Sequence, residues 1–163
     1  MSKHETPMTR WYWQRIGGTL IEEFPAVKRS STCGQRLIDG IIIKNEQKCI
    51  ARPEEIHLKG KDIIVIQTKA ARLGMYLMGQ AFFSAKLMKP FFPRSIESVA
   101  LCLEDDSVLG PLFENPPNMN VVVCPKGFPL HTWPPRFHHS IKVTLIFFQR
   151  FTNAIIRFIS ASS

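Results

Sequence analysis

The sequence predicts a single α/β domain in which a central mixed β-sheet is flanked by helices. The chain has 163 residues, of which 45% are hydrophobic and 21% charged, a globular composition with enough length to bury a core. Short apolar, β-branched segments indicate strands, and longer segments with three- and four-residue apolar spacing indicate helices. Their order is helix, three strands, helix and two strands, which gives an α/β sandwich.

The first part of the chain is expected to hold one helix and two strands. Thr9 is a candidate cap for a short helix over residues 10–16, which a glycine pair ends. The aromatic residues of this helix favour packing on a sheet, and a platform for base stacking is the alternative. Residues 19–27 favour a strand, and a polar hairpin connection leads to the second strand at residues 37–43.

The next elements follow a charged excursion in the sequence. Residues 63–66 are fully apolar, as in a strand that is buried on both faces. Residues 72–89 then predict a long helix, which Pro90 stops. Two further strands are expected at residues 96–103 and 120–125, and proline closes the second of them.

The charge and the cysteines bear on partners and compartment. Twenty-one Lys and Arg against 13 Asp and Glu give a net charge of +8, which favours polyanionic partners. The four cysteines form no C-x-x-C pair, so zinc is not expected, and they are read as mainly structural, buried thiols. The polar start does not resemble a signal peptide. Together these features predict a cytoplasmic protein with reduced thiols.

The character of the sequence changes at residue 126, which divides it into a domain at residues 9–125 and a tail. Glu114 is the last acidic residue, and residues 126–163 are basic and apolar. A membrane span here would carry Arg150 near its centre, at a cost of several kcal/mol. A membrane is therefore not the expected partner, and a basic amphipathic tail lying on the domain, on nucleic acid or on a membrane surface is favoured instead.

Polar residues interrupt or end two of the apolar strands. Asp39 lies in the second strand, and Gln67 and Lys69 follow the third. Because side chains alternate along a strand, Gln67 and Lys69 are expected on the same face, with the carbonyl of Thr68 as a further ligand. These groups suit a metal ion and a phosphate. The alternative for Asp39 is a turn residue before Gly40, since Asp-Gly is a common turn pair.

The order of the elements, with Asp39 on one strand and Gln67-x-Lys69 on the next, resembles the PD-(D/E)XK nuclease superfamily, which has the restriction-endonuclease-like fold. The resemblance covers about residues 11–125. In that family an Asp and a Glu-x-Lys or Gln-x-Lys bind a divalent cation and position water. The resemblance implies a nuclease acting on DNA with Mg²⁺ or Mn²⁺, in which Asp39, Gln67 and Lys69 are catalytic.

The sequence departs from the family at Gln67, where glutamate is commoner. An amide supplies an oxygen ligand but no charge, so the cation needs a second carboxylate beside Asp39. The family often contributes an early glutamate from the first helix or strand. Glu23 is the first choice for this catalytic and metal-binding role, and Glu22 is the reserve. In an extended segment the two point to opposite faces, so only one reaches the site.

Three more residues are candidates for contacts with nucleic acid. Arg36 and Arg72 flank the site and suit backbone phosphates, and Gln80 follows in the long helix. For each the alternative is an ordinary surface position. Two functions follow from the sequence: a Mg²⁺-dependent nuclease, in a family whose small members often act as homodimers, and a catalytically inactive module of the same fold that binds nucleic acid or protein.

Overall fold

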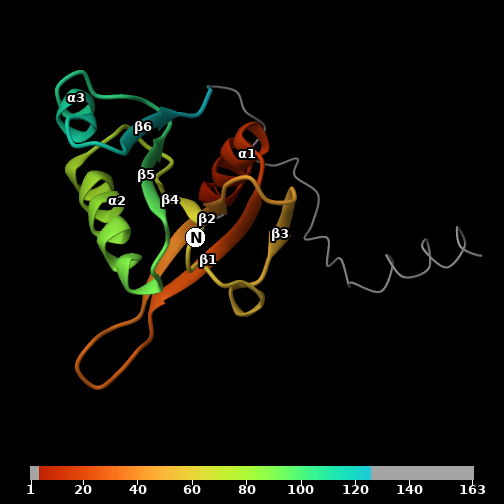
Figure 1. Ribbon diagram of the computed structural model, residues 1–163. Helices are drawn as coiled ribbons and strands as arrows, with labels where there is room; N and C mark the ends of the chain where they lie inside the picture. Colours follow the sequence, from red (N-terminus) through yellow and green to blue (C-terminus); the bar gives the residue numbers. More distant parts are fainter. Residues whose placement is uncertain (1–3, 126–163) are drawn as a thin grey trace, which may run out of the picture. The chain divides into compact units, whose positions relative to one another are not determined.

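The computed structural model describes residues 4–125, which belong to the first of two units, residues 1–132. The predicted strands and helices fall within this part, whereas the predicted tail at residues 126–163 lies outside the described residues. In chain order the elements are α1 (Glu5–Ile16), β1 (Thr19–Val27), β2 (Arg36–Ile43), β3 (Cys49–Ala51), η1 (Pro53–Glu55), β4 (Asp62–Thr68), α2 (Met75–Leu87), η2 (Lys89–Phe91), β5 (Ser95–Cys102), α3 (Leu109–Glu114) and β6 (Met119–Val123) (Figure 1).

A six-stranded mixed sheet in the order β3-β1-β2-β4-β5-β6 forms the centre of the described part. Strands β1, β2 and β4 are antiparallel neighbours, whereas β4, β5 and β6 run parallel. Parallel neighbours need a crossover connection, which α2 provides between β4 and β5 and α3 between β5 and β6. The predicted α/β class, with a mixed sheet flanked by helices, is therefore confirmed.

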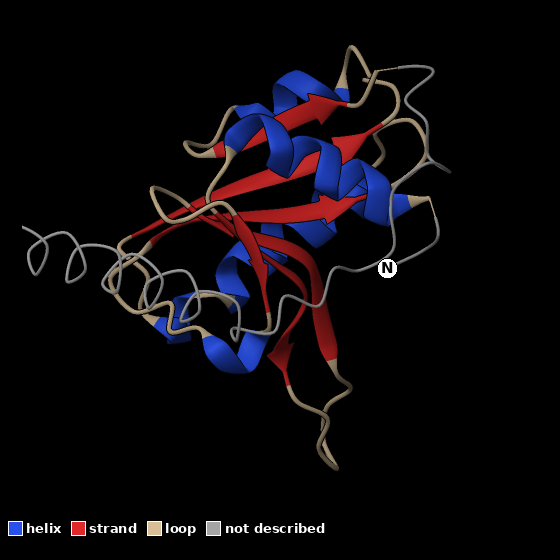
Figure 2. Ribbon diagram, turned by 90° about the vertical axis from the view of Figure 1, so that its right-hand side faces the viewer, coloured by secondary structure: helices blue, strands red, loops and turns tan. Residues whose placement is uncertain are grey.

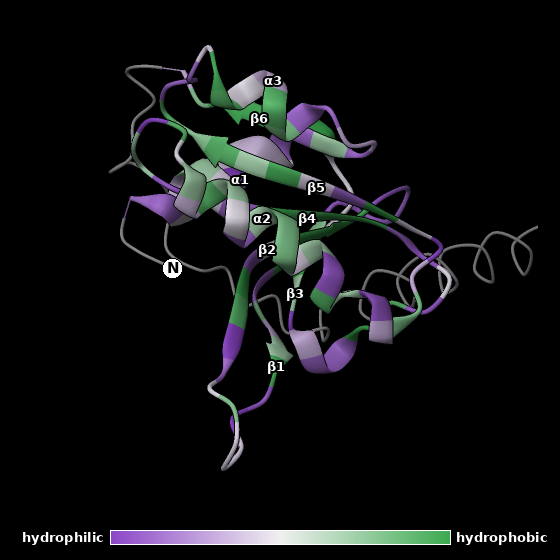
Figure 3. Cartoon of the chain, turned by 90° about the vertical axis from the view of Figure 1, so that its left-hand side faces the viewer, coloured by the Kyte–Doolittle hydropathy of each residue, from purple (hydrophilic) through white to green (hydrophobic). Residues whose placement is uncertain are grey.

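Helices cover both faces of the sheet, α1 on one and α2 on the other (Figure 2). Alternate residues of β4 serve the two layers: Ile64 and Ile66 pack with α1, and Ile63 and Val65 face the opposite core. This confirms that the strand is buried on both faces. The aromatic residues of α1 pack as expected, because Trp13 is 7% exposed within the core. Figure 3 shows hydrophobic β4 beside a more hydrophilic hairpin between β1 and β2.

Helix α1 lies close to the sheet because Gly40 has no side chain. A Cβ on Gly40 would lie 2.7 Å from Cγ2 of Thr9. The hydroxyl of Thr9 lies 2.8 Å from that of Thr68 at the end of β4 and donates to the carbonyl of Glu5. Thr9 is thus an interior residue of α1 and not its cap. The turn alternative for Asp39 is wrong as well, because β2 continues through both Asp39 and Gly40.

We expect Gly40→Ala to lower the free energy of unfolding by roughly 1–3 kcal/mol, because the added methyl group meets Thr9 and pushes α1 off the sheet. Urea denaturation measures the change. Gly79→Ala is the matched control: nothing lies within 4 Å of its added Cβ, and alanine is the better helix former, so this variant gains stability. The double variant Gly40→Ala/Thr9→Ala recovers part of the loss. A Gly40→Ala protein as stable as the parent contradicts this packing.

The four cysteines are free thiols, as predicted. Cys102 and Cys124 are buried in the core, and burial raises the pKa of the Cys102 thiol to about 11. Such a thiol stays protonated and unreactive near neutral pH. Cys33 is exposed and Cys49 half-buried, so the expectation of buried cysteines holds for only two of the four.

Candidate functional site

Asp39 of β2 is half-buried beside the end of β4. Its Oδ2 accepts a hydrogen bond of 2.8 Å from the backbone N–H of Thr68, which fixes the carboxylate where the two predicted strands meet. Burial raises the pKa of Asp39, the Thr68 N–H lowers it, and the negative charges of Glu5 and Glu23 raise it again. A carboxylate that is destabilised by its neighbours gains when a cation binds beside it.

Lys69 follows β4 and reaches the N-terminal turn of α1. Its Nζ lies 3.2 Å from Oε1 of Glu5, and the lysine side chain is half exposed whereas that of Glu5 is only 11% exposed. Because Asp39 binds the N–H of Thr68, the residue before Lys69, ionisable groups from α1, β2 and the end of β4 come together. We call this group the Glu5–Asp39–Lys69 cluster.

Sequence reasoning missed Glu5 because it placed the start of the helix too late. Helix α1 begins at Glu5, with Pro7 in its first turn. Proline is tolerated in the first turn, where the missing N–H has no partner to lose, and acidic residues are common there. Glu5 followed by Pro7 is therefore the pattern from which the earlier start could have been recognised.

Gln67 lies on the other face of the sheet. Its side chain is 4% exposed, and its Nε2 donates a 2.8 Å hydrogen bond to Oγ of Ser84 in α2. The expectation that Gln67 and Lys69 face the same ion is wrong. Regular β4 ends at Thr68, so the alternation that would pair the two side chains does not extend to Lys69, which pairs with α1.

We expect Gln67→Glu to lower the free energy of unfolding by at least about 2 kcal/mol at pH 7, because it puts a charge into a buried site beside Ser84. The loss shrinks at acidic pH, where the new carboxyl group is protonated. Urea denaturation at both pH values measures it. Gln80→Glu, at a half-buried amide of α2, is the control and changes stability little. Stronger metal-dependent activity without loss of stability would instead support Gln67 as a metal ligand.

The two glutamates proposed from the sequence have different environments. Glu22 forms a bidentate ion pair with Arg10 of α1, with nitrogen–oxygen distances of 2.7 and 2.8 Å. Both side chains are nearly buried, and the hydrogen bond raises the pKa of Arg10. Glu22 therefore links β1 to α1 through this ion pair, and its carboxylate is not available as a metal ligand. Glu23 remains near Asp39, since its charge acts on the pKa of that carboxyl.

The sheet is irregular where Glu23 and Asp39 meet. Glu23 has a φ of 51°, a left-handed conformation that residues other than glycine rarely adopt, and it lies between the cross-strand pairs on either side of Asp39. In both strands, two residues that face the same core are separated here by three positions, whereas regular alternation of side chains would separate them by two or four. They are Ile21 and Phe24 in β1 and Ile38 and Ile41 in β2. Such irregularities are common next to active sites.

The predicted nucleic-acid contacts lie outside the cluster. Arg72 pairs with Glu104 at 2.5 Å, and Nε2 of Gln80 donates to the hydroxyl of Tyr76. Arg36 is exposed at the start of β2. Arg72 therefore has a local partner, whereas Arg36 has no ion-pair partner in residues 4–125.

The described residues offer few donors for a divalent cation. Within the described residues, no three His, Cys, Asp or Glu side chains are grouped to hold a metal ion. The expected set of Asp39, Gln67 and Glu23 is not assembled, because Gln67 faces α2. Mg²⁺ is usually bound by one or two carboxylates, with water and substrate phosphates completing its shell. Asp39 with Glu5 or Glu23 fits that smaller set.

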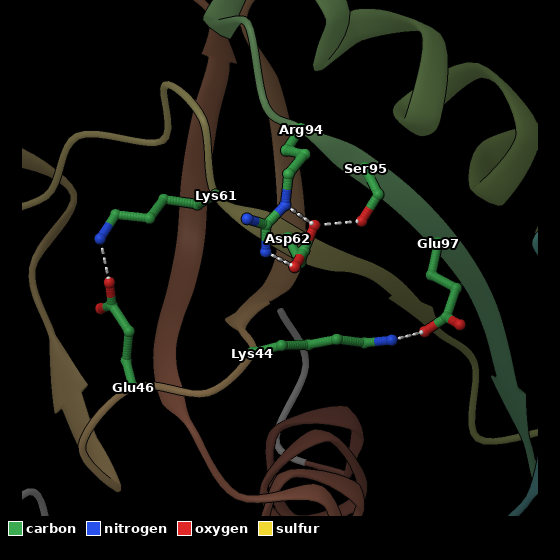
Figure 4. A network of polar contacts seen from close by, with 7 residues as sticks. All are labelled: Lys44, Glu46, Lys61, Asp62, Arg94, Ser95 and Glu97. Carbon is green, nitrogen blue, oxygen red and sulfur yellow. Dashed lines mark hydrogen bonds and ion pairs between the residues drawn. The ribbon is translucent and has the colours of Figure 1, made fainter.

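Charges at the start of β4 are paired, in contrast to Asp39 (Figure 4). The carboxylate of Asp62 accepts hydrogen bonds from Arg94 and Ser95, and the Arg94 bond holds the pKa of Asp62 well below its usual range. Two more pairs surround it, Lys44 with Glu97 at 2.7 Å and Lys61 with Glu46 at 2.5 Å. Asp39, which lies beside the other end of β4, has no such cationic partner among residues 4–125. The carboxylate at the start of β4 is therefore neutralised by a neighbouring cation, whereas the one beside its end is not.

No protein-family model, curated protein or solved structure matches the chain. Within residues 4–125, the helices are all too short or too polar to cross a membrane. The order of the strands and the chemistry of the Glu5–Asp39–Lys69 cluster are therefore the grounds for inferring a function.

Proposed function

We propose that the chain is a metal-dependent nuclease with the restriction-endonuclease-like fold, hydrolysing phosphodiester bonds of DNA at the Glu5–Asp39–Lys69 cluster. One observation carries the proposal: the Asp39 carboxylate is fixed by the Thr68 N–H beside the Lys69–Glu5 pair. Helix α1, the antiparallel strands β1, β2 and β4, the crossover helix α2 and the parallel strand β5 follow one another in the chain, with the short strand β3 between β2 and β4. This order supports the resemblance to the PD-(D/E)XK superfamily.

The residues of the cluster supply what phosphodiester hydrolysis needs. Charge builds on the phosphate during the reaction and must be neutralised, and a water must be aligned with the scissile bond. When bound, Mg²⁺ or Mn²⁺ supplies a Lewis acid for this purpose. Asp39 and a second carboxylate, Glu5 or Glu23, hold the cation, and the ammonium of Lys69 contacts a phosphate oxygen and the attacking water.

The Lys69–Glu5 ion pair is compatible with this role. Lys69 is half exposed whereas Glu5 is only 11% exposed, so the pair is not a fully solvated one. The exchange of Glu5 for a phosphate is balanced because a phosphate oxygen replaces the carboxylate as the charged acceptor of the ammonium. Once Lys69 turns to the substrate, Glu5 exchanges the ammonium for the cation as its partner. Glu5 also supplies the negative charge that an amide at position 67 lacks, in the position where the family often has an early glutamate.

The proposal predicts cleavage that depends on a divalent cation. The purified full-length chain should nick and linearise plasmid DNA with Mg²⁺ or Mn²⁺. EDTA should abolish this activity, and excess Mg²⁺ should restore it, because the carboxylates bind the cation reversibly. Agarose gels of supercoiled plasmid measure the result. A folded chain that cleaves no DNA with either cation contradicts the proposal.

The second candidate is a catalytically inactive module of the same fold that binds nucleic acid or protein. The burial of Gln67 against Ser84 favours it, because it removes one ligand from the expected metal site. In this case the chain binds DNA in a salt-dependent way, cleaves none, and retains its affinity in Asp39→Ala. Cleavage that disappears in this variant selects the nuclease.

A further inference from the structure

A groove lies between the β1–β2 hairpin and the second half of α2, apart from the Glu5–Asp39–Lys69 cluster. Its cavity of about 340 Å³ has an apolar lining that includes Val27 and Leu87. Phe83, Arg36 and Lys86 also line it, so an aromatic ring and two cations border one apolar groove. The hairpin projects from the sheet on the same side as α2 (Figure 1).

An exposed aromatic stripe on α2 leads into this groove. Tyr76 is 72% exposed and Phe83 65% exposed, and Gln80 lies between them with its amide bonded to the Tyr76 hydroxyl. Their spacing of four and three residues puts all three side chains on one face of the helix. The ring of Phe82 meets that of Phe83 edge to face at 5.4 Å, which helps to fix the orientation of Phe83. Exposed apolar side chains that gather on one face and are rimmed by polar groups are typical of binding surfaces.

The charge around the groove is positive and not compensated locally. Neither Arg36 nor Lys86 forms an ion pair within residues 4–125, and the sequence has no acidic residue between Phe24 and Ile38 or between Ile63 and Ile96. At the start of β4, by contrast, Lys61 and Arg94 are both paired (Figure 4). A second copy of the chain docked face to face would bring like charges together. The charge of the groove therefore favours a polyanion over a second copy of the chain.

We propose that the groove and the aromatic stripe bind single-stranded DNA, with a base stacked on Phe83 and phosphates on Arg36 and Lys86. Stacking on an aromatic side chain needs an unpaired base, because a duplex hides the faces of its bases. The inference rests on the proposed function and narrows its substrate class to DNA that carries a single-stranded segment. It also gives Arg36 a role consistent with its predicted contact with nucleic acid.

Fluorescence anisotropy of the full-length chain with a labelled oligothymidylate, in EDTA so that no cleavage occurs, tests the inference. Phe83→Ala should weaken binding of the single strand roughly tenfold and binding of a duplex of equal length much less. Phe92→Ala is the matched control, at an aromatic side chain that is 70% exposed outside the groove, and leaves both affinities unchanged.

Salt titration tests the two cations. Arg36→Ala and Lys86→Ala should each make the slope of log K against log salt shallower by up to about one, because each removes a phosphate contact. Lys59→Ala, at an exposed lysine outside the groove, leaves the slope unchanged. Equal slopes for all three variants and the parent overturn the placement of phosphates on Arg36 and Lys86.

The groove and the nuclease can fail separately. Single-strand affinity unchanged in Phe83→Ala, or lost equally for both forms of DNA, overturns the groove inference. So does a Phe83→Ala variant whose sedimentation changes while its DNA affinity does not, because the face is then a contact between copies. A parent chain that binds through Phe83 but cleaves no DNA with Mg²⁺ supports the groove and removes the nuclease. A parent chain that cleaves DNA, together with a Phe83→Ala variant whose DNA affinity is unchanged, supports the nuclease and removes the groove inference.

Discussion

Replacing Lys69 by alanine is expected to slow DNA cleavage roughly 10²- to 10⁴-fold, the range for loss of a group that assists proton transfer or stabilises charge in the transition state. The ammonium is half exposed beside Glu5, and Lys69 directly follows Thr68, whose N–H binds Asp39, so its removal takes away the only lysine in the cluster. Single-turnover rates on plasmid DNA with saturating enzyme measure the chemical step apart from binding.

Lys61→Ala is the matched control for Lys69→Ala. Lys61 is 45% exposed and pairs with Glu46, much as Lys69 is 50% exposed and pairs with Glu5. Loss of the Lys61–Glu46 pair alone costs little stability. Lys69→Ala also takes the cationic partner from the largely buried Glu5 and costs more, so urea denaturation first confirms that both variants are folded under the assay conditions. Only Lys69→Ala should lose cleavage. Equal rates for the two variants would remove Lys69 from the mechanism.

Asp39→Asn is expected to abolish cleavage and yet stabilise the fold at pH 7. The amide retains an oxygen acceptor for the Thr68 N–H but loses the charge that binds a cation, so the rate should fall by roughly a hundredfold or more. Burial and the carboxylates of Glu5 and Glu23 raise the pKa of Asp39 in the folded chain. Ionised Asp39 therefore costs folding free energy, which the neutral variant does not pay.

The pH dependence of unfolding gives the sign of this effect. Because the pKa of Asp39 is raised above the ordinary value of 3.8, the folded state holds its proton more tightly than the unfolded state. Parent stability through this group is greatest below 3.8 and falls as pH rises to the raised pKa. The advantage of Asp39→Asn should therefore be full at pH 7 and vanish below pH 3.8 in urea denaturation.

Asp62→Asn provides a control of opposite sign. The hydrogen bond from Arg94 lowers the pKa of Asp62 in the folded state, so ionised Asp62 stabilises the fold above the unfolded pKa, and this stability is lost as pH falls. Asp62→Asn should thus be less stable than the parent at pH 7. If Asp39→Asn behaves in the same way as Asp62→Asn, Asp39 is an ordinary structural carboxylate and the site assignment is wrong.

The periodic elements could be predicted from the sequence, whereas the short helix α3 could not. Strand β4 is predictable because a continuous run of apolar, β-branched residues is stable only when it is buried on both faces of a sheet. Helix α3 has six residues, too few for a hydrophobic period to show. Strand β3 lies where the sequence left a weak strand or a turn open, at Cys49 and Ile50. The start of α3 depends on Asp106, whose carboxylate accepts the N–H groups of Val108 and Leu109. Helix α2 is shorter than expected, with Met75 as its first residue.

The sequence by itself determined the α/β class, the mixed sheet and the placement of Asp39 within one strand and of Lys69 just after the next long one. These follow from the burial of β-branched runs and from the order of segments. Only the tertiary structure decided which other groups join them. Regular β4 ends at Thr68, which separates Gln67 from Lys69, and the bare backbone of Gly40 lets α1 bring Glu5 to the site. Where a strand ends and how closely a helix packs on the sheet depend on neighbouring elements of the fold. The local sequence does not determine them.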